Sequence, residues 1–446
     1  MIHTSIHRDL IGILIAAFVV HTALVFVALP LAADALGGHY RLGHFADGND
    51  RIAMNLVQGH GYRSLRNGAP TMVREPGYPL YLALVFKVFG KDIKVVQLLN
   101  IVLAMLTALV VARLAEFVSP HRFVRLAAPV ALLTHPGLIV AEARGGFEVV
   151  FILFLSLSLL LFYRALQRNT VALYVAAGTL LGLSTLIRSS LMLIPAGLLL
   201  AMLIYHWRTP ALKQVPGRFL ALLLPILVVV SPWVVRNYML VGTLVPGATV
   251  SGIAAYTGQY MCEHRFEDQR TTRQLDSDAA REINRITKDN GFKFRGRYYR
   301  YFFDSKDELA LNTILLNTVA TKYRESPALF AKCLALHAFD FWFTGSNRLA
   351  TMANVAIQLP FLLLLAAGIY LSIRSGQFAV VFPLIMVIGY FVLLHIAIHA
   401  QARYSVQVLP FASIFVAISL NQLWLTVTGR KRRRSLAPPH GEPVPH

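Results

Sequence analysis

Three features that mark other classes of protein are missing from this chain of 446 residues. No glycine-rich loop follows a strand-like segment, so no nucleotide-binding fold is evident. No internal repeat is visible, which disfavours the repeated halves that are typical of many transporters. Only two cysteines occur, Cys262 and Cys333. At most one disulfide can therefore form within the chain, and the alternative is two unpaired thiols.

Charged residues are also sparse, at 14% of the chain, whereas 56% of the residues are hydrophobic. The apolar residues form repeated runs of about 20 residues, the length that a bilayer core of about 30 Å requires of a helix. The composition therefore predicts an all-α polytopic membrane protein. We expect about ten transmembrane helices, near residues 10–31, 93–117, 126–141, 148–164, 171–187, 190–206, 218–235, 352–373, 378–396 and 405–425.

The basic residues predict the orientation of these helices. The run Tyr78–Phe89 is too short to span and is interrupted by Lys87, so we expect a helix that lies along the interface. With this run not crossing and the N-terminus inside, the basic loops and the tail from Arg430 to Arg434 all fall on the inner side. These charges suit anionic membrane lipids or a lipid phosphate. They are not interleaved with stacking aromatics, which disfavours nucleic acid.

The same orientation gathers a set of polar residues at the opposite, outer face. Such convergence is typical of a cavity for an anionic substrate. The alternative is a group of interfacial side chains that snorkel, pair and cap helix ends. The set comprises Asp47, Asp50, Arg74, Glu75, Glu142, Arg144, Glu148, Arg188, Arg236, His395, His399 and Arg403.

The chain is predicted to have four parts. These are a transmembrane core at 1–235 with a first outer loop at 32–92, an extracytoplasmic segment at 236–350, C-terminal transmembrane helices at 351–428 and a basic cytoplasmic tail at 429–446. Within the extracytoplasmic segment, helical periodicity predicts amphipathic helices at Leu309–Lys322 and Pro327–Phe343. We expect the charged stretch Glu263–Lys306 to be loop with short amphipathic pieces.

Short motifs follow one another along the chain. The first outer loop contains, after its acids, Ala53-x-Asn55-Leu56-x-x-Gly59-x-Gly61-Tyr62 and Arg74-x-Pro76-Gly77-Tyr78-Pro79. Later landmarks are Glu148 at the start of a span, Thr185-Leu186-Ile187-Arg188-Ser189, Pro232-Trp233-x-x-Arg236-Asn237 and Arg403-Tyr404. In these motifs and their order, residues 10–425 resemble the GT-C fold glycosyltransferases of the family 39 type. That family includes relatives of protein mannosyltransferases and of lipid A aminoarabinose transferases.

The resemblance implies a glycosyltransferase that moves a sugar from a polyprenyl-phosphate donor to an acceptor hydroxyl of a lipid, glycan or protein at the outer face of the membrane. The acceptor hydroxyl needs a base, for which Asp47 is the first candidate and Asp50 the second. The leaving phosphate needs preorganised cations. For that role we expect Arg74, Arg236, Arg188 and Arg403, and for the substrate cavity Glu75, Tyr78, Glu148, Tyr62, His60 and Arg144.

Three alternatives remain open at this point. His395 and His399 are four residues apart on a helix and can chelate a metal together with Glu148, but no further ligand is fixed by the sequence, so we expect no cofactor. A transporter or flippase would use the same arginines to guide a lipid phosphate without breaking a bond. A ligase of the same fold would transfer a preassembled glycan from a lipid diphosphate. The expected location is a bacterial inner membrane.

Overall fold

The computed structural model describes residues 2–35, 45, 47–266, 271–295, 302–345 and 347–429, and all statements below refer to these. Nearly all of the predicted basic tail, 429–446, and part of the first outer loop lie outside the described residues. Within them the architecture is all-helical, with isolated β-bridges and no strand. The predicted fold class is therefore confirmed.

The helices of the first half of the chain lead from the N-terminus to the end of the seventh predicted span. They are α1 (Ile2–Ala23), the π-helical turn η1 (Leu24–Ala28), α2 (Leu29–Ala35), α3 (Asn49–Val57), α4 (Gly77–Phe89), α5 (Ile93–Val118), α6 (Arg122–Leu133), α7 (Pro136–Ala143), α8 (Glu148–Arg168), α9 (Val171–Ile187), η2 (Ser189–Leu191), α10 (Ile194–His206), η3 (Pro210–Gln214) and α11 (Val215–Val241).

The second half of the chain contains eight elements, the first four of which are not candidate spans. They are α12 (Val250–Glu263), α13 (Thr272–Asp289), α14 (Ser305–Glu325), α15 (Pro327–Trp342), α16 (Arg348–Arg374), α17 (Phe378–Ile398), η4 (Ala402–Val408) and α18 (Leu409–Val427).

Eight helical stretches are long and apolar enough to cross a membrane, or nine if the bent pair α6 and α7 is one span. That pair bends by 49° where Pro136 begins α7, because proline cannot continue the hydrogen bonding of α6. Helix α9, with 17 residues, is at the lower limit for a span and packs between α8 and α11. Together these elements coincide with the ten predicted spans.

The helices of the bundle differ in how much protein surrounds them. In α8, 78% of the most apolar window is buried, which agrees with its uniformly apolar sequence. In α11 only 17% of that window is buried, and its exposed residues include Leu220, Leu224 and Val228. We assign this exposed apolar face of α11 to lipid, since exposing so much apolar surface to water is unfavourable.

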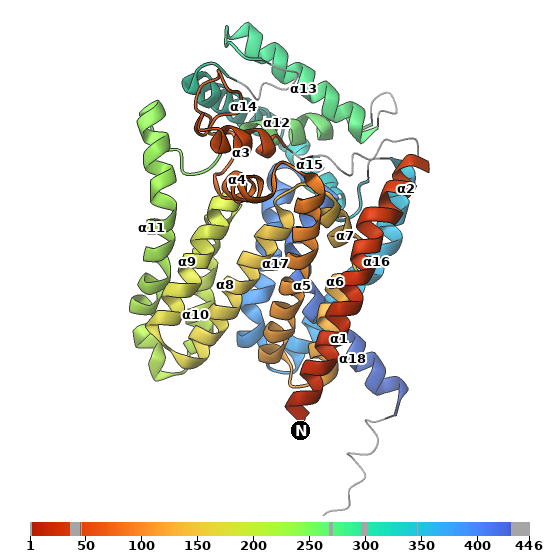
Figure 1. Cartoon of the computed structure of the whole chain (residues 1–446). Coiled ribbons are helices and arrows are strands. Elements are labelled where there is room, and N and C mark those ends of the chain that lie inside the picture. Colours follow the sequence, from red (N-terminus) through yellow and green to blue (C-terminus); the bar gives the residue numbers. More distant parts are fainter. Residues whose placement is uncertain are drawn as a thin grey trace, which may run out of the picture.

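The first outer loop and the helices α12–α14 lie at one end of the bundle, and the N-terminus lies at the other (Figure 1). Helix α4, with 13 residues, lies across that upper end beneath α3 instead of running along the bundle. A second, smaller hydrophobic core joins α12, α13 and α14 through residues such as Tyr256, Ile283 and Leu315. The bundle thus carries a helical cap at one end.

Helix α13 corrects one expectation. The stretch from Glu263 to Lys306 contains an amphipathic helix of 18 residues and not only short pieces. It begins with a capping box in which Thr271 and Gln274 satisfy each other's backbone N–H groups. The spacing Thr-x-x-Gln is the sequence signal that marks this start.

The opposite end of the bundle collects the basic connections between spans. Arg122 at the start of α6 forms an ion pair with Asp9 of α1. Asn169 after α8 donates a hydrogen bond to Gln214 at the α10–α11 connection, which Figure 1 shows at the same end as the N-terminus. This clustering agrees with the arrangement on which the predicted orientation depends.

Candidate active site

The first candidate base, Asp47, sits in an unusual backbone conformation. Its φ is 64° and that of the following Gly48 is 75°, so two successive residues are left-handed immediately before α3 begins at Asn49. Aspartate tolerates this region better than most residues because its short side chain can hydrogen-bond locally. The Nε of Arg74 donates to the backbone oxygen of Asp47 at 3.1 Å, which holds the turn against the second motif of the loop.

The carboxylate of Asp47 lies between two predicted phosphate-binding arginines. Its Oδ1 is 3.5 Å from Nη2 of Arg74, and its Oδ2 is 3.6 Å from Nη1 of Arg403. Arg74 belongs to the first outer loop and Arg403 to η4, which follows α17. The fold therefore brings one aspartate and two guanidinium groups together from distant parts of the sequence.

A third predicted arginine, Arg188, adjoins this group through aromatic side chains. Its guanidinium lies 4.8 Å from the ring centre of Tyr404 and 5.1 Å from that of Phe147. The Tyr404 ring also carries the guanidinium of Arg403 at 5.2 Å. One tyrosine thus stacks with both cations, which holds the two positive charges near each other despite their repulsion.

The second candidate base, Asp50, forms an ion pair with a lysine. It is in the first turn of α3, and its Oδ2 accepts a hydrogen bond from Nζ of Lys91 at 2.6 Å. Lys91 follows Gly90, the residue that ends α4. The sequence reasoning did not single out Lys91, although a basic residue just after an interfacial helix was a possible signal. Which of the two aspartates is the base stays a prediction.

The side chain of Arg236 contacts the backbone of the first outer loop. Its Nη1 donates to the carbonyl of Thr71 at 2.9 Å, and its Nη2 donates to that of Tyr62 at 3.3 Å. Its guanidinium also stacks on the rings of Tyr62 and Trp233, at 5.1 and 4.7 Å. These contacts make Arg236 an anchor for the loop, and its predicted role at the phosphate stays a prediction.

Tyr62 and Glu75 also hold the loop in place. The hydroxyl of Tyr62 lies within hydrogen-bonding distance of the backbone oxygens of Arg74 and Glu75, at 2.9 and 3.0 Å. Burial raises the pKa of Tyr62 well above its usual value, so this hydroxyl keeps its proton and donates it. The carboxylate of Glu75 accepts hydrogen bonds from the backbone N–H and the hydroxyl of Ser189, at 3.0 and 2.5 Å. The contacts of both residues are therefore with the backbone and side chains around Arg74, and they help to position it.

Several predicted site residues have a buried polar atom that the described part of the chain leaves without a hydrogen-bond partner. Buried polar groups in proteins nearly always have a partner, so such atoms mark places for water or a ligand. The atoms are Nδ1 of His60, the hydroxyl of Tyr78, Oε2 of Glu148, Nη1 of Arg188 and Nε of Arg403.

A cavity of about 370 Å³ adjoins Arg403 and Glu148. Three predicted residues line it, namely Arg144, Glu148 and Arg403. Its remaining walls come from α7, α12, α13, α15, α16 and η4, and include Met261, Asp340 and Gln358. The volume is within the range of small-molecule sites, and the lining offers both cationic donors and carboxylate acceptors.

The two histidines of α17 and its end are engaged with other groups. Nδ1 of His395 donates to the carbonyl of Phe391 at 2.7 Å, which leaves Nε2 to accept from Nη2 of Arg188 at 2.8 Å. Nε2 of His399 lies 3.0 Å from the side-chain nitrogen of Gln401. Across the described residues, no three His, Cys, Asp or Glu side chains come together as a metal site would require.

Glu308 is a residue of this region that the sequence reasoning missed. Its buried carboxylate accepts hydrogen bonds from the hydroxyl of Thr71 at 2.7 Å, from the N–H of Met72 at 2.8 Å and from the hydroxyl of Thr249. It thereby ties α14 to the loop segment just before Arg74. In the sequence it looks like an ordinary acid in the first turn of a helix, beside Asp307.

Comparisons with known proteins agree with this architecture. Residues 73–235 match the sequence model of the dolichyl-phosphate-mannose-protein mannosyltransferase family. The oligosaccharyltransferase AglB from Archaeoglobus fulgidus, solved with an inhibitory peptide and a dolichol-phosphate, superposes with a TM-score of 0.56 at 13% identity over 98% of this chain. The chain has the GT-C fold. The resemblance found in the sequence is therefore confirmed.

These matches differ in how much of each chain they cover. The chain covers 52% of the length of AglB, so the GT-C fold is shared over about half of that protein. ArnT from Cupriavidus metallidurans, solved with bound undecaprenyl phosphate, has a TM-score of 0.39 at 15% identity, with 96% of this chain and 81% of ArnT covered. The search of curated proteins finds no match.

Proposed function

We propose that this protein transfers a sugar from a polyprenyl-phosphate donor to an acceptor hydroxyl of a lipid, a glycan or a protein. The observation that carries the proposal is the position of Asp47, whose carboxylate lies between Arg74 and Arg403, the second of which lines the cavity. A base next to two cations is what such a transfer needs, since one substrate group loses a proton while the other leaves as an anion. The GT-C fold and the match over residues 73–235 support this reaction class.

Asp47 acts as the general base in this proposal. Its carboxylate takes the proton of the acceptor hydroxyl as the acceptor oxygen bonds to the anomeric carbon of the sugar. The bond from that carbon to the phosphate oxygen breaks, and the polyprenyl phosphate leaves with the electron pair. Before the acceptor arrives, the two arginines lie on either side of this carboxylate.

The ion pairs at Asp47 are loose enough to exchange. Their separations of 3.5 and 3.6 Å exceed the usual 2.7–2.9 Å of a direct hydrogen bond between charged groups. A donor phosphate entering the site competes for Arg74 and Arg403 and draws them from the carboxylate. Donor binding then frees Asp47 for the proton at the same step at which the cations reach the leaving group.

Arg188 and Glu148 provide further contacts to the donor. Nη1 of Arg188 and Nε of Arg403 are buried donors without a protein partner among the described residues, and they suit phosphate oxygens. Oε2 of Glu148 is a buried acceptor without a hydrogen-bond partner there, and it suits a sugar hydroxyl. We place this site at the extracytoplasmic face of a bacterial inner membrane, because the basic connections gather at the opposite end of the bundle.

The proposal is tested with purified full-length protein in lipid vesicles, supplied with a panel of polyprenyl-phosphate sugars. Released polyprenyl phosphate is measured. We expect Asp47→Asn to lower turnover by about 100-fold or more, the usual contribution of a general base, and Asp50→Asn to lower it much less. Asp9→Asn is the matched control, since Asp9 lies at the other end of the bundle and should not affect turnover.

Three results would contradict the proposal. Equal turnover of the wild type and Asp47→Asn would remove the base. Movement of lipid phosphate across the vesicle membrane without release of sugar would favour the flippase. Turnover only with a lipid-diphosphate glycan would point to the ligase instead.

A further inference from the structure

The only two cysteines of the sequence lie on α12 and α15, two helices that pack against each other. Cys262 is near the end of α12 and Cys333 is within α15, and both are buried and free in the structure. The pKa of Cys262 is raised by its contact with Cys333 and by burial, and that of Cys333 is lowered. The two thiols come from different helices, so a disulfide of about 2.05 Å between them would link α12 to α15.

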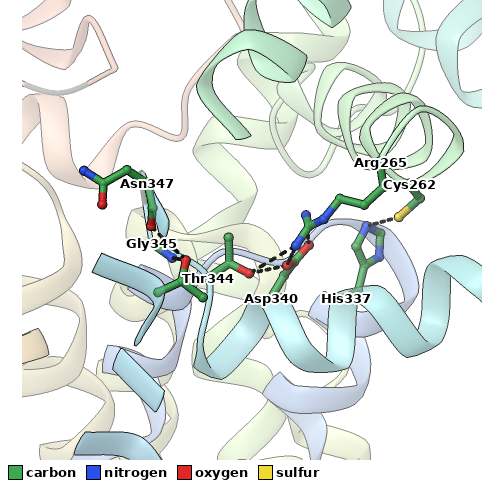
Figure 2. Close-up of polar contacts among 8 residues, drawn as sticks. Cys262, Arg265, His337, Asp340, Thr344, Gly345 and Asn347 are labelled. Carbon is green, nitrogen blue, oxygen red and sulfur yellow. Dashed lines mark hydrogen bonds and ion pairs between the residues drawn. The ribbon is translucent and has the colours of Figure 1, made fainter. Parts of the chain in front are cut away.

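A histidine is placed to take a proton from one of these thiols. Sγ of Cys262 is 3.1 Å from Nε2 of His337, one turn after Cys333 on α15 (Figure 2). Nδ1 of His337 donates to the carbonyl of Ile396 at 2.9 Å, so Nε2 carries the lone pair that faces the thiol. Nε2 can therefore accept the proton of Cys262 as this sulfur ionises, and the thiolate is the reactive species in disulfide exchange.

An ion pair also joins the same two helical segments. Arg265, just after α12, binds Asp340 of α15 in a two-pronged ion pair at 2.8 and 3.1 Å, and Thr344 also donates to Asp340 (Figure 2). Asp340 and Thr344 line the cavity beside Arg403. Whatever fixes the separation of α12 and α15 therefore fixes one wall of that cavity.

We propose that Cys262 and Cys333 are joined by a disulfide in the mature protein, and that this bond locks the α12–α15 wall of the cavity. The bond rests on the extracytoplasmic placement proposed above, because disulfides persist in oxidising compartments. The oxidant is a protein disulfide. One cysteine thiolate attacks it to give a mixed disulfide, the other thiolate then displaces the oxidant, and two electrons and two protons pass to a dithiol product.

The bond is tested in cells that express the full chain. Thiols are trapped at once by acid, the protein is denatured, and a maleimide of high mass is added before or after reduction. We expect the wild type to gain no adduct before reduction and two after. The single variants Cys262→Ser and Cys333→Ser should each gain one adduct under both conditions. Two adducts before reduction, or a covalent dimer without reductant, would overturn the proposal.

A second measurement tests the locking of the wall and separates this proposal from the proposed function. The melting temperature of the purified wild type should fall on reduction, whereas that of the double variant with both cysteines changed to serine should not respond to reductant. An unchanged melting temperature on reduction would refute the lock. Neither readout uses a sugar donor, so a protein that is oxidised and stabilised but transfers no sugar contradicts only the proposed function.

Discussion

Glu308 provides the sharpest test of how the cap positions the active-site loop. Two of its three hydrogen-bond donors, the N–H of Met72 and the hydroxyl of Thr249, meet Oε1, whereas the hydroxyl of Thr71 meets Oε2. Glu308→Ala leaves all three donors without their acceptor. At about 1–2 kcal/mol for each buried donor, the loss is roughly 3–6 kcal/mol of local stability in the loop.

Glu308→Gln should have a smaller effect that the same geometry explains. The amide oxygen can still accept from Met72 and Thr249, and only the contact with Thr71 is exchanged for an amide N–H₂. We expect turnover to decrease in the order wild type, Gln, Ala. The loss for Ala should be between about 10- and 100-fold, because a loosened loop displaces Arg74 and a displacement of about 1 Å can cost about 100-fold in rate.

The assay for these variants is release of polyprenyl phosphate, measured together with thermal melting. Glu325→Gln is the matched control, since Glu325 is exposed at the other end of the same helix, α14, and should leave both readouts unchanged. Full turnover by Glu308→Ala would show that the loop needs no clamp and would refute the reasoning. A lower melting temperature with full turnover would reduce Glu308 to a purely structural role.

Two further predictions concern packing and pH. A Cβ at Gly77 would lie 2.8 Å from the backbone of Leu186 and Ile187, so Gly77→Ala should separate α4 from α9 and lower the melting temperature, at a cost of about 1–3 kcal/mol; an unchanged melting curve would contradict this. Burial alone would raise the pKa of Glu263, but hydrogen bonds from Lys322 and Gln259 outweigh it and lower the pKa below 4.5. Glu263 therefore stabilises the fold above that pH. The difference in melting temperature between the wild type and Glu263→Gln should be present at pH 7 and vanish as the pH falls below the lowered pKa. A difference independent of pH would exclude the ion pair as its source.

The transmembrane helices could be predicted because length and hydropathy are local properties. The interfacial helix at Tyr78–Phe89 was also accessible, since 13 residues cannot cross a bilayer. The bend at Pro136 and the full length of α13 were not foreseen. Proline and the Thr271 capping box were visible in the sequence, but whether a broken helix makes one span or two depends on its neighbours.

The site could be predicted only in part. Residue type and membrane side grouped Asp47 with the arginines, and the structure brings Arg74 and Arg403 to it. The sequence could not tell these cations from Arg236, because the difference lies in whether a guanidinium faces a carboxylate or a backbone carbonyl. Glu308 was out of reach for a similar reason, since its partners come from segments that are far apart in the chain.

The low protein contact of α11 has a consequence for the loop that it holds. Most of the apolar window of this helix is exposed and we assign that surface to lipid, yet Arg236 near its end donates hydrogen bonds to the carbonyls of Tyr62 and Thr71. A helix in such surroundings adjusts its tilt to the thickness of the bilayer. We therefore expect membrane thickness to set the position of Arg236 and of the loop backbone that it binds. A detergent micelle of different thickness would shift the loop without altering a single covalent bond.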